Sequence, residues 1–434
     1  MGNKKEIFKL LIKEFQEMEL PEIKERDLKL PEKTNKIITI SGPRRAGKTY
    51  YFYQLIQKLK KRVPIERIIY TNFEDDRLFP LNLEDLNSLT EAYFELYPEN
   101  KKKEIYCFLD EIQNIKNWEL FIRRIYDKEK VKIFITGSSS KLLSQEIATS
   151  LRGRTLNYQI YPLSFKEFLR FKNIKIERNF IYSQKRFQIK KMFEEYVVFG
   201  GFPEIVLEKE NLKLSVLKNY YDLTIYRDLV ERFAIRNIDF LKSLIKYSLT
   251  NFSNLFSANA YYQSLEKPLK PARETFLEHL SYLEEIELIF LVPIFSYSLK
   301  VQQVNPKKIY TIDNGLRNTV SFRFSQDYGR LLENLTFIEL KRRGKDVYYY
   351  KGKKECDFLI KEGLKITQAI QVVENLTGEN KERETEGLIG AIQKFDLNKG
   401  LILTKDEEKE VKKIVNGKII KIKIMPLWQW LLAD

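Results

Sequence analysis

The elements around one glycine-rich stretch decide the fold of the first part of the chain. The stretch reads Gly42-Pro43-Arg44-Arg45-Ala46-Gly47-Lys48-Thr49. The apolar run IITI at residues 37–40 precedes it and predicts a buried strand, and residues 50–61 follow with helical spacing of apolar side chains. A strand, the pattern G-x-x-x-x-G-K-[ST] and a helix in this order predict a phosphate-binding loop.

The residues of this loop suit a nucleoside triphosphate. Gly42 and Gly47 let the loop curl so that backbone N–H groups face a phosphate, and the following helix adds its positive N-terminal dipole. Lys48 can bridge the β- and γ-phosphates, and the Thr49 hydroxyl can ligate Mg²⁺. ATP and Mg²⁺ are therefore the expected ligands. The residues expected to contact the nucleotide are Gly42, Pro43, Arg44, Arg45, Ala46, Gly47, Lys48, Thr49, Tyr50 and Ser138.

An acidic pair ends a second apolar run, at Phe108-Leu109-Asp110-Glu111. A carboxylate at the tip of a neighbouring buried strand can hold Mg²⁺, and we assign this task to Asp110 together with Thr49. Glu111 can orient and polarise the attacking water. Lys48 and Glu111 are thus the predicted catalytic pair.

Two later features bear on the same site. The stretch Thr136-Gly137-Ser138-Ser139 ends the apolar run at residues 132–136, and its hydroxyls are expected to face the γ-phosphate from between the loop and the acidic pair, with Ser138 as the candidate contact. A polar cap between strand and helix is the other interpretation. Arg152 and Arg154 come soon afterwards, and either can serve as an arginine finger that stabilises transition-state charge. The sequence leaves open whether such an arginine acts within its own chain or on a neighbour.

Composition limits the class of protein. A chain of 434 residues predicts about three domains. No apolar run reaches the roughly 18 residues that a membrane span needs, and the start of the chain lacks a secretory signal, so we expect a cytoplasmic protein. The net charge of +16 suits a polyanion such as nucleic acid, but it also suits the Lys/Glu-rich surface of a thermophile.

The small number of cysteine and histidine residues argues against several kinds of metal site and catalysis. Cys107 and Cys356 lie far apart in the sequence, and His279 is the only histidine. These numbers argue against a zinc site, a disulfide framework and Ser-His or Cys-His catalysis. We expect His279 to be structural, because it lies in a helical stretch.

The predicted organisation has five parts. A helix and connector occupy residues 1–35, and an α/β P-loop ATPase core with a parallel sheet occupies 36–160. A helical lid is expected at 161–208, where Ser164 and Glu167 form a capping box. Three helices and a β-hairpin predict a winged helix at 209–318. A further α/β unit occupies 319–434.

With these residues in hand, the chain resembles the archaeal-type AAA-superfamily ATPases that carry a C-terminal domain of unknown function. The resemblance covers nearly the whole length. Beyond the phosphate-binding loop it rests on the stretches Leu109-Asp110-Glu111-Ile112-Gln113, Thr136-Gly137-Ser138-Ser139-Ser140, Tyr161-Pro162-Leu163-Ser164-Phe165-Lys166-Glu167-Phe168, Gly200-Gly201-Phe202-Pro203-Glu204 and Tyr226-Arg227-Asp228-Leu229. It implies a RecA-like core, a helical lid, a winged helix and a C-terminal domain like the restriction endonucleases.

The C-terminal domain departs from the nuclease pattern that the resemblance implies. Glu333 and Asp357 match the helix glutamate and strand aspartate of such nucleases. Gln371-Val372-Val373 stands where Glu-x-Lys is expected, and an amide and a valine neither complete a Mg²⁺ site nor supply the lysine. We therefore expect no DNA cleavage.

Two functions remain open at this point. The first is an ATPase that acts on or with DNA through its winged helix and C-terminal domain. Lys267, Lys270 and Arg273 at the start of the recognition helix, and Lys300, Lys307 and Lys308 around the wing, are the candidate phosphate contacts. The acidic residues of that helix, Glu274, Glu278, Glu284 and Glu285, argue against this. The second is an ATP-dependent switch that controls protein association without DNA. Self-association is open in both, and no membrane partner is expected.

Overall fold

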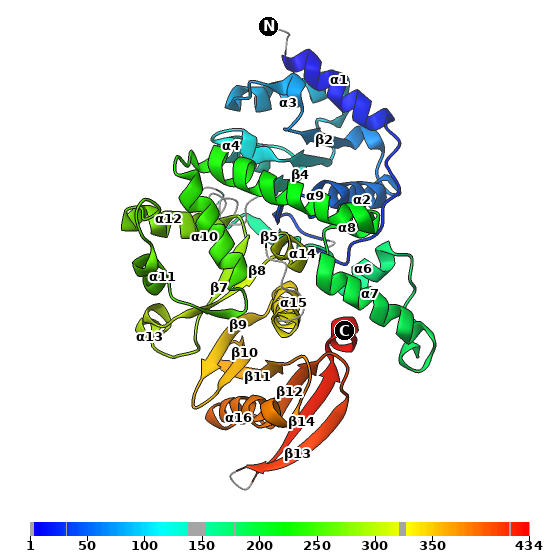
Figure 1. The fold of residues 1–434 in the computed structure, drawn as a ribbon. Helices are drawn as coiled ribbons and strands as arrows, with labels where there is room; N and C mark the ends of the chain where they lie inside the picture. Colours follow the sequence, from blue (N-terminus) through cyan, green and yellow to red (C-terminus); the bar gives the residue numbers. More distant parts are fainter. Residues whose placement is uncertain are drawn as a thin grey trace. The chain divides into compact units, whose positions relative to one another are not determined.

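The computed structural model describes residues 4–31, 33–137, 151, 153–177, 179–320, 327–415 and 418–433. The chain forms two compact units, Met1–Tyr161 and Pro162–Asp434, called here the N-terminal and C-terminal units (Figure 1). No helix in the described ranges is long and apolar enough to cross a membrane.

The N-terminal unit is built on a parallel sheet. Its strands are β1 (Ile37–Ser41), β2 (Ile68–Asn72), β3 (Ile105–Asp110), β4 (Val131–Gly137) and β5 (Thr155–Gln159). Their order across the sheet is β2-β3-β4-β1-β5, with every pairing parallel. This confirms the predicted α/β class. The order places β4 between β1 and β3, in agreement with the expectation that the polar end of this strand lies between the loop and the acidic pair.

Helices cover both faces of this sheet because its strand residues alternate between two apolar cores. Ile38, Ile40 and Phe108 pack with Phe52 and Ile56 of α2 (Lys48–Lys60). The other face packs against three helices: α1 (Lys4–Glu17), α3 (Leu83–Leu96) and α4 (Trp118–Lys128). In Figure 1, α1 lies alongside α3, as their packing requires. A sheet buried on both sides explains why its strands read as nearly continuous apolar runs.

The C-terminal unit opens with helices. These are α6 (Phe165–Phe171), α7 (Lys185–Phe199), α8 (Pro203–Leu207) and α9 (Glu210–Leu223), which continues into a π-helical segment at Thr224–Glu231. The capping box predicted at α6 is confirmed. The Ser164 hydroxyl accepts a hydrogen bond from the Glu167 N–H at 3.1 Å, and the Glu167 carboxylate accepts one from the Ser164 N–H at 2.9 Å.

A three-stranded sheet follows within the same unit. The chain runs through α10 (Ile238–Thr250), β6 (Asn254–Phe256), α11 (Ala258–Ser264), α12 (Arg273–Glu285), β7 (Ile289–Val292), α13 (Leu299–Val304) and β8 (Lys307–Thr311). The sheet order is β6-β8-β7, with antiparallel pairing. The short helix α14 (Asn314–Asn318) then leads toward the last part of the chain.

The last part of the C-terminal unit contains a mixed sheet with the order β13-β14-β12-β11-β10-β9. Its elements are α15 (Tyr328–Arg342), β9 (Asp346–Lys351), β10 (Glu355–Glu362), β11 (Lys365–Val372), α16 (Gly378–Lys394), β12 (Lys399–Thr404), β13 (Lys409–Val415), β14 (Lys418–Pro426) and α17 (Leu427–Leu432). The pairing of Ile294 with Tyr349 joins the segment after β7 to β9. The hairpin of β13 and β14 was not predicted from the sequence.

Candidate nucleotide site

Tight backbone geometry shapes the glycine-rich loop between β1 and α2. A Cβ at Gly42 would lie 2.2 Å from the carbonyl oxygen of Ile160, so no larger residue fits there without moving the backbone. Gly47, which caps α2, has φ 94° and ψ 29°, a left-handed conformation that favours glycine. Arg45 also has a positive φ, of 65°. Both glycines of the predicted motif are therefore required by the path of the chain.

The connector before β1 braces this loop from outside. The Arg26 guanidinium donates to the carbonyl oxygens of Ala46 and Tyr161, each at 2.7 Å. The Arg26 N–H donates to the Gln54 side chain of α2 at 2.8 Å. Arg26 thus links the loop, α2 and the end of the unit. The sequence pattern gave no signal for it, because Arg26 lies in a connector without periodicity.

Lys48 is buried, with 4% of its surface exposed, and its ammonium has weak partners. The Nζ atom lies 3.2 Å from the Gly42 carbonyl oxygen and 3.3 Å from that of Pro43. It lies 3.3 Å from Oε1 of Glu111, which is the carboxylate paired with it. The lysine and the glutamate that were predicted to act together are therefore brought together.

Asp110 is fully buried at the end of β3 and accepts hydrogen bonds from three hydroxyl groups. Thr49 donates to its Oδ2 at 2.7 Å and Tyr70 to the same oxygen at 3.0 Å, while Thr136 donates to Oδ1. Burial raises the pKa of Asp110, and the bonds from Thr136 and Thr49 only partly oppose this. A divalent cation would favour the ionised form of such a carboxylate.

Glu111 has a strained backbone, with φ 55° and ψ 43° at a residue other than glycine. Its N–H donates to the Thr136 hydroxyl at 3.0 Å, and its Oε2 accepts from the Gln113 amide at 2.5 Å. Burial opposes ionisation, but Lys48 and the bond from Gln113 hold the pKa of Glu111 below its ordinary value. Glu111 is therefore an ionised carboxylate at neutral pH.

Thr136 joins the two acidic residues, since its hydroxyl donates to Asp110 and accepts from the Glu111 N–H. It can do so because β4 lies between β1 and β3. Tyr70 was not among the predicted site residues, and Thr136 was predicted only as part of the polar stretch facing the γ-phosphate, not as a link between the two acidic residues. Thr136 precedes the predicted Ser138 by two residues, so the polar end of that apolar run was the available signal.

The other predicted residues still to be located are Arg44, Tyr50, Ser138, Arg152 and Arg154. Ser138 and Arg152 fall outside the described residues. Two nitrogens of Arg154 each lie 3.2 Å from a carboxylate oxygen of Asp127. Tyr50 is exposed, and its ring centroid lies 5.8 Å from that of Tyr53. A guanidinium nitrogen of Arg44 lies 3.0 Å from a carboxylate oxygen of Glu74.

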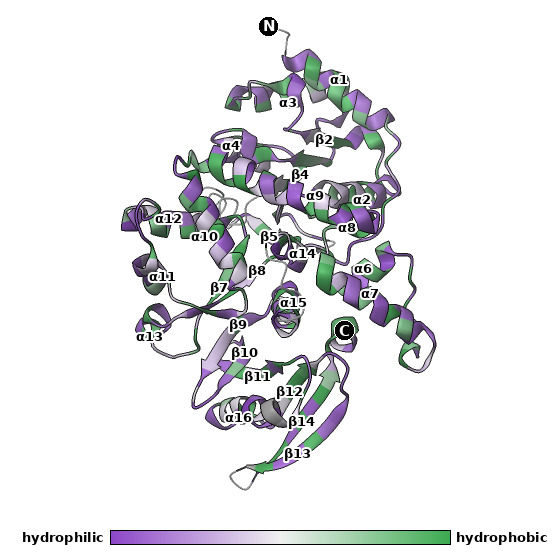
Figure 2. Ribbon diagram, viewed as in Figure 1, coloured by the Kyte–Doolittle hydropathy of each residue, from purple (hydrophilic) through white to green (hydrophobic). Residues whose placement is uncertain are grey.

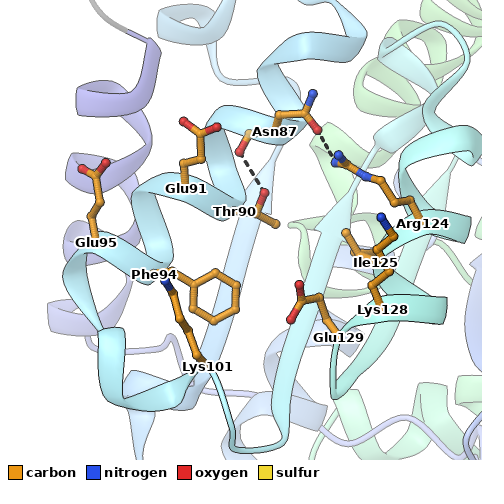
Figure 3. Close-up of a pocket in the computed structure, with 10 residues that line it drawn as sticks. All are labelled: Asn87, Thr90, Glu91, Phe94, Glu95, Lys101, Arg124, Ile125, Lys128 and Glu129. Atoms are coloured by element: carbon orange, nitrogen blue, oxygen red, sulfur yellow. Dashed lines mark hydrogen bonds between the residues drawn. The ribbon is translucent and has the colours of Figure 1, made fainter.

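A hollow of about 580 Å³ in the same unit is separate from these residues. It lies between α3 and α4, and its lining mixes Phe94 and Ile125 with charged side chains such as Glu91 and Lys128 (Figure 3). The Arg124 guanidinium donates to the Asn87 side chain at its rim. None of the predicted nucleotide residues lines it, and we assign it no function.

The C-terminal unit brings Glu333 and Asp357 together as the nuclease resemblance implies, but around a lysine. The Nζ atom of Lys308 lies 3.0 Å from Glu333, 2.8 Å from Asp357 and 2.7 Å from Glu355. Tyr310 donates to Glu333 at 2.6 Å. Lys308 was expected to contact phosphates beside the wing, and this is wrong, because only 2% of its surface is exposed.

Gln371 is committed to neighbours as well. Its amide donates to Glu384 at 2.6 Å, and its oxygen accepts from the Asp357 N–H at 3.2 Å.

Over the described ranges, no group of three or more His, Cys, Asp or Glu residues is arranged to hold a metal ion. His279 is buried and stacks on Phe240, with ring centroids 5.4 Å apart. Cys107 and Cys356 are buried free thiols.

The chain matches known families in two regions. Residues 34–169 match the AAA domain family, and residues 190–327 match a family described as a domain of unknown function (DUF8612). An uncharacterized protein of Methanocaldococcus jannaschii is 43% identical over 94% of this chain and 91% of its own length. An uncharacterized protein of Haemophilus influenzae is 33% identical over 79% of this chain and 84% of its own.

Solved structures resemble the chain more distantly. A DNA polymerase III gamma subunit-related protein from Thermotoga maritima is 13% identical over 69% of this chain and 88% of its own, with a TM-score of 0.26. A TM-score this low supports no inference about domain arrangement or activity.

Proposed function

The chain belongs to the family of that Methanocaldococcus jannaschii protein, and because its residues 34–169 match an AAA domain, we propose that it binds ATP and hydrolyses it to ADP and phosphate. One observation carries the proposal. The two predicted pairs are in contact: Lys48 with Glu111, and Thr49 with Asp110. They adjoin the glycine-rich loop, in which Gly42 leaves no room for a side chain.

The residues present fit a nucleotide with Mg²⁺. Thr49 and Asp110 are already joined at 2.7 Å and offer the oxygen ligands that Mg²⁺ prefers. A bound Mg²⁺ would neutralise charge on the β- and γ-phosphates. The residues of the glycine-rich loop would hold the phosphates through their N–H groups.

The chain's own groups then divide the work. The Lys48 ammonium exchanges its carbonyl contacts for phosphate oxygens and stabilises the charge that develops there. Glu111 orients and polarises the attacking water, and its strained backbone, tied to Thr136, fixes the direction of its carboxylate. Lys48 and Glu111 are the catalytic residues of this proposal, and Thr136 is a positioning residue.

An arginine finger completes the proposal. Arg152 and Arg154 remain the candidates, and Ser138 remains the candidate sensor of the γ-phosphate. Arg154 would have to leave Asp127, an exposed pairing that contributes at most about 1 kcal/mol. If a second copy supplies the finger, turnover per chain rises with protein concentration. Turnover independent of concentration in a monomer would place the finger within one chain.

We propose further that the ATPase acts on DNA. The charge of +16 supports a polyanionic target, and the order of elements from α10 to β8, with its β6-β8-β7 sheet, supports the expected winged helix. One observation favours the alternative, an ATP-dependent switch for protein association. The exposed charges of α12, the expected recognition helix, are Arg273 against Glu274 and Glu278.

The test of the ATPase proposal is turnover and nucleotide binding of the wild type and of Glu111→Gln. The amide keeps the shape of the carboxylate but cannot polarise water, so binding should persist while turnover stops. Glu111→Gln with undiminished turnover would refute the assigned role, and loss of ATP binding would make Glu111 a binding residue instead.

A further inference from the structure

Three lysines stand abreast on the last sheet of the C-terminal unit. The register pairs Lys412 of β13 with Lys421 of β14, and Lys421 with Lys399 of β12. All three side chains are exposed. Because adjacent strands are about 4.8 Å apart, the three residues form a row about 10 Å long across the sheet. We call Lys399, Lys412 and Lys421 the lysine row.

The lysine row lies on the face of the sheet opposite α16. Ile420 and Ile422 of β14 point into the apolar core that Leu388 and Ile392 of α16 complete. Side chains alternate along a strand, so Lys421 points to the other face. Figure 2 shows hydrophilic and hydrophobic residues alternating along β14, as this arrangement requires.

The lysine row has an energetic cost, and the acidic residue on its face of β13, Glu410, lies opposite Lys423 rather than opposite a member of the row. Like charges directly opposite each other on adjacent strands are destabilising. Lys418 on the same hairpin is paired with Asp396, and Lys405 after β12 with Glu194 at 3.0 Å. Within the described part of the chain, no member of the lysine row has such a carboxylate partner. An external anion would relieve the repulsion.

Protection of a sheet edge does not account for the row. Lysines on an edge strand prevent pairing with other chains, and this explains Lys412 on β13. Lys421 and Lys399 lie on the second and third strands, which have no free edge. A row of charges that crosses three strands instead matches a partner whose negative charges also follow a line.

We propose that the lysine row binds the phosphodiester backbone of DNA, which lies across β13, β14 and β12. The inference rests on the proposal that the ATPase acts on DNA, and it places the contact on this sheet rather than on α12. Beside the row on the same face, the facing pair Ile414 and Ile419 is 78% and 62% exposed and can pack against deoxyribose. Such contacts position DNA and do not read its sequence.

The experiment compares the full-length wild type with a row variant, Lys399→Gln, Lys412→Gln and Lys421→Gln together. The control variant combines Lys353→Gln, Lys354→Gln and Lys365→Gln. It removes three exposed lysines of the same domain and has the same net charge as the row variant. Binding to a short DNA duplex and to single-stranded DNA is measured by fluorescence anisotropy over a range of salt. Unfolding midpoints and ATP turnover without DNA verify that both variants are intact.

The row variant should bind DNA about tenfold or more weakly at low salt, and the slope of log affinity against log salt should fall by roughly 2 to 3 for duplex DNA. The control variant should bind like the wild type. If the row variant keeps the wild-type slope, the lysine row is not the contact, although DNA remains the target. If the wild type binds neither duplex nor single-stranded DNA, both the proposed action on DNA and the assignment of the lysine row fail.

A membrane surface is the competing partner, because the row adjoins exposed isoleucines. Vesicles with anionic headgroups, tested with the same three proteins, distinguish it from DNA. Vesicle binding that depends on the lysine row while DNA binding does not would overturn the inference.

Discussion

Lys48 in the N-terminal unit and Lys308 in the C-terminal unit are both buried beside carboxylates, but their ammonium groups are held in different ways. Lys48 faces Glu111 at 3.3 Å and two carbonyl oxygens at 3.2 and 3.3 Å. Lys308 faces three carboxylates at 2.7 to 3.0 Å. Burial alone would lower the pKa of Lys308, but Asp357 and Glu333 hold it well above its ordinary value.

The difference separates a binding group from a structural one. Two of the three contacts of Lys48 are to neutral oxygens, which a phosphate can replace with stronger charge-assisted bonds. The carboxylates around Lys308 exceed it in charge, and burial raises the pKa of Glu333. An ammonium so enclosed cannot be given up without leaving buried charges unpaired. We therefore expect Lys48 to bind the phosphates of ATP and Lys308 to hold β8, α15 and β10 together.

The largest effect on stability should come from Lys308→Met. Removing one partner of a buried ion cluster leaves uncompensated charge and costs about 3–5 kcal/mol. The denaturation midpoint of the C-terminal unit should fall, while ATP binding to the folded protein persists. Lys300→Met, an exposed lysine of α13, is the control and should unfold like the wild type. An unchanged midpoint for Lys308→Met would show that the cluster contributes little.

A smaller effect is expected from Thr136→Val, which tests the link between Asp110 and Glu111. The valine leaves the buried Glu111 N–H without its acceptor, which should lower the free energy of unfolding by about 1–3 kcal/mol. We expect kcat to fall by roughly 10- to 100-fold with little change in KM, since the water-polarising group is misplaced while phosphate contacts remain. Thr136→Ser restores the hydroxyl and should recover most of the activity. A Thr136→Ser variant as slow as Thr136→Val would point to packing instead.

The smallest effect is expected from Asp357→Ala in DNA cleavage, because the wild type should not cleave. Lys308 occupies the space among Glu333, Glu355 and Asp357, and Gln371 is bonded to Glu384. Supercoiled and linear DNA incubated with Mg²⁺ or Mn²⁺, with and without ATP, should stay intact with either protein. Nicking by purified wild type that disappears in Asp357→Ala would mean that Lys308 belongs to an active centre.

Local patterns predicted the residues of the candidate nucleotide site, and contacts between distant segments were missed. The glycine-rich loop and the pair Asp110-Glu111 could be identified because each is a short run beside an apolar strand. The hydrogen bonds from Thr136 and Tyr70 to Asp110 could not, because they depend on β2 and β4 flanking β3 in the sheet, and strand order is not encoded in any one segment.

The same limit applies in the C-terminal unit. Lys308 was predicted to be a phosphate contact because it flanks the wing with Lys300 and Lys307, and the local sequence did not indicate that both faces of β8 are buried from Lys308 onward. Its burial follows from α15 and β10, which come later in the chain. The β13–β14 hairpin was missed because lysines recur through both strands and break the apolar run that would predict a buried strand.

The most direct test of the account is ATP binding and turnover by Lys48→Ala beside the wild type. Losing one or two charge-assisted contacts of about 1.5–3 kcal/mol each should weaken ATP binding by about 100-fold. Turnover should be abolished, because the charge that develops on the phosphates loses its stabilising cation. The unfolding midpoint should fall only modestly, because the buried Glu111 carboxylate loses its paired ammonium but keeps the hydrogen bond from Gln113. ATP affinity and turnover that are unchanged in Lys48→Ala would contradict the assignment of this loop as the nucleotide site.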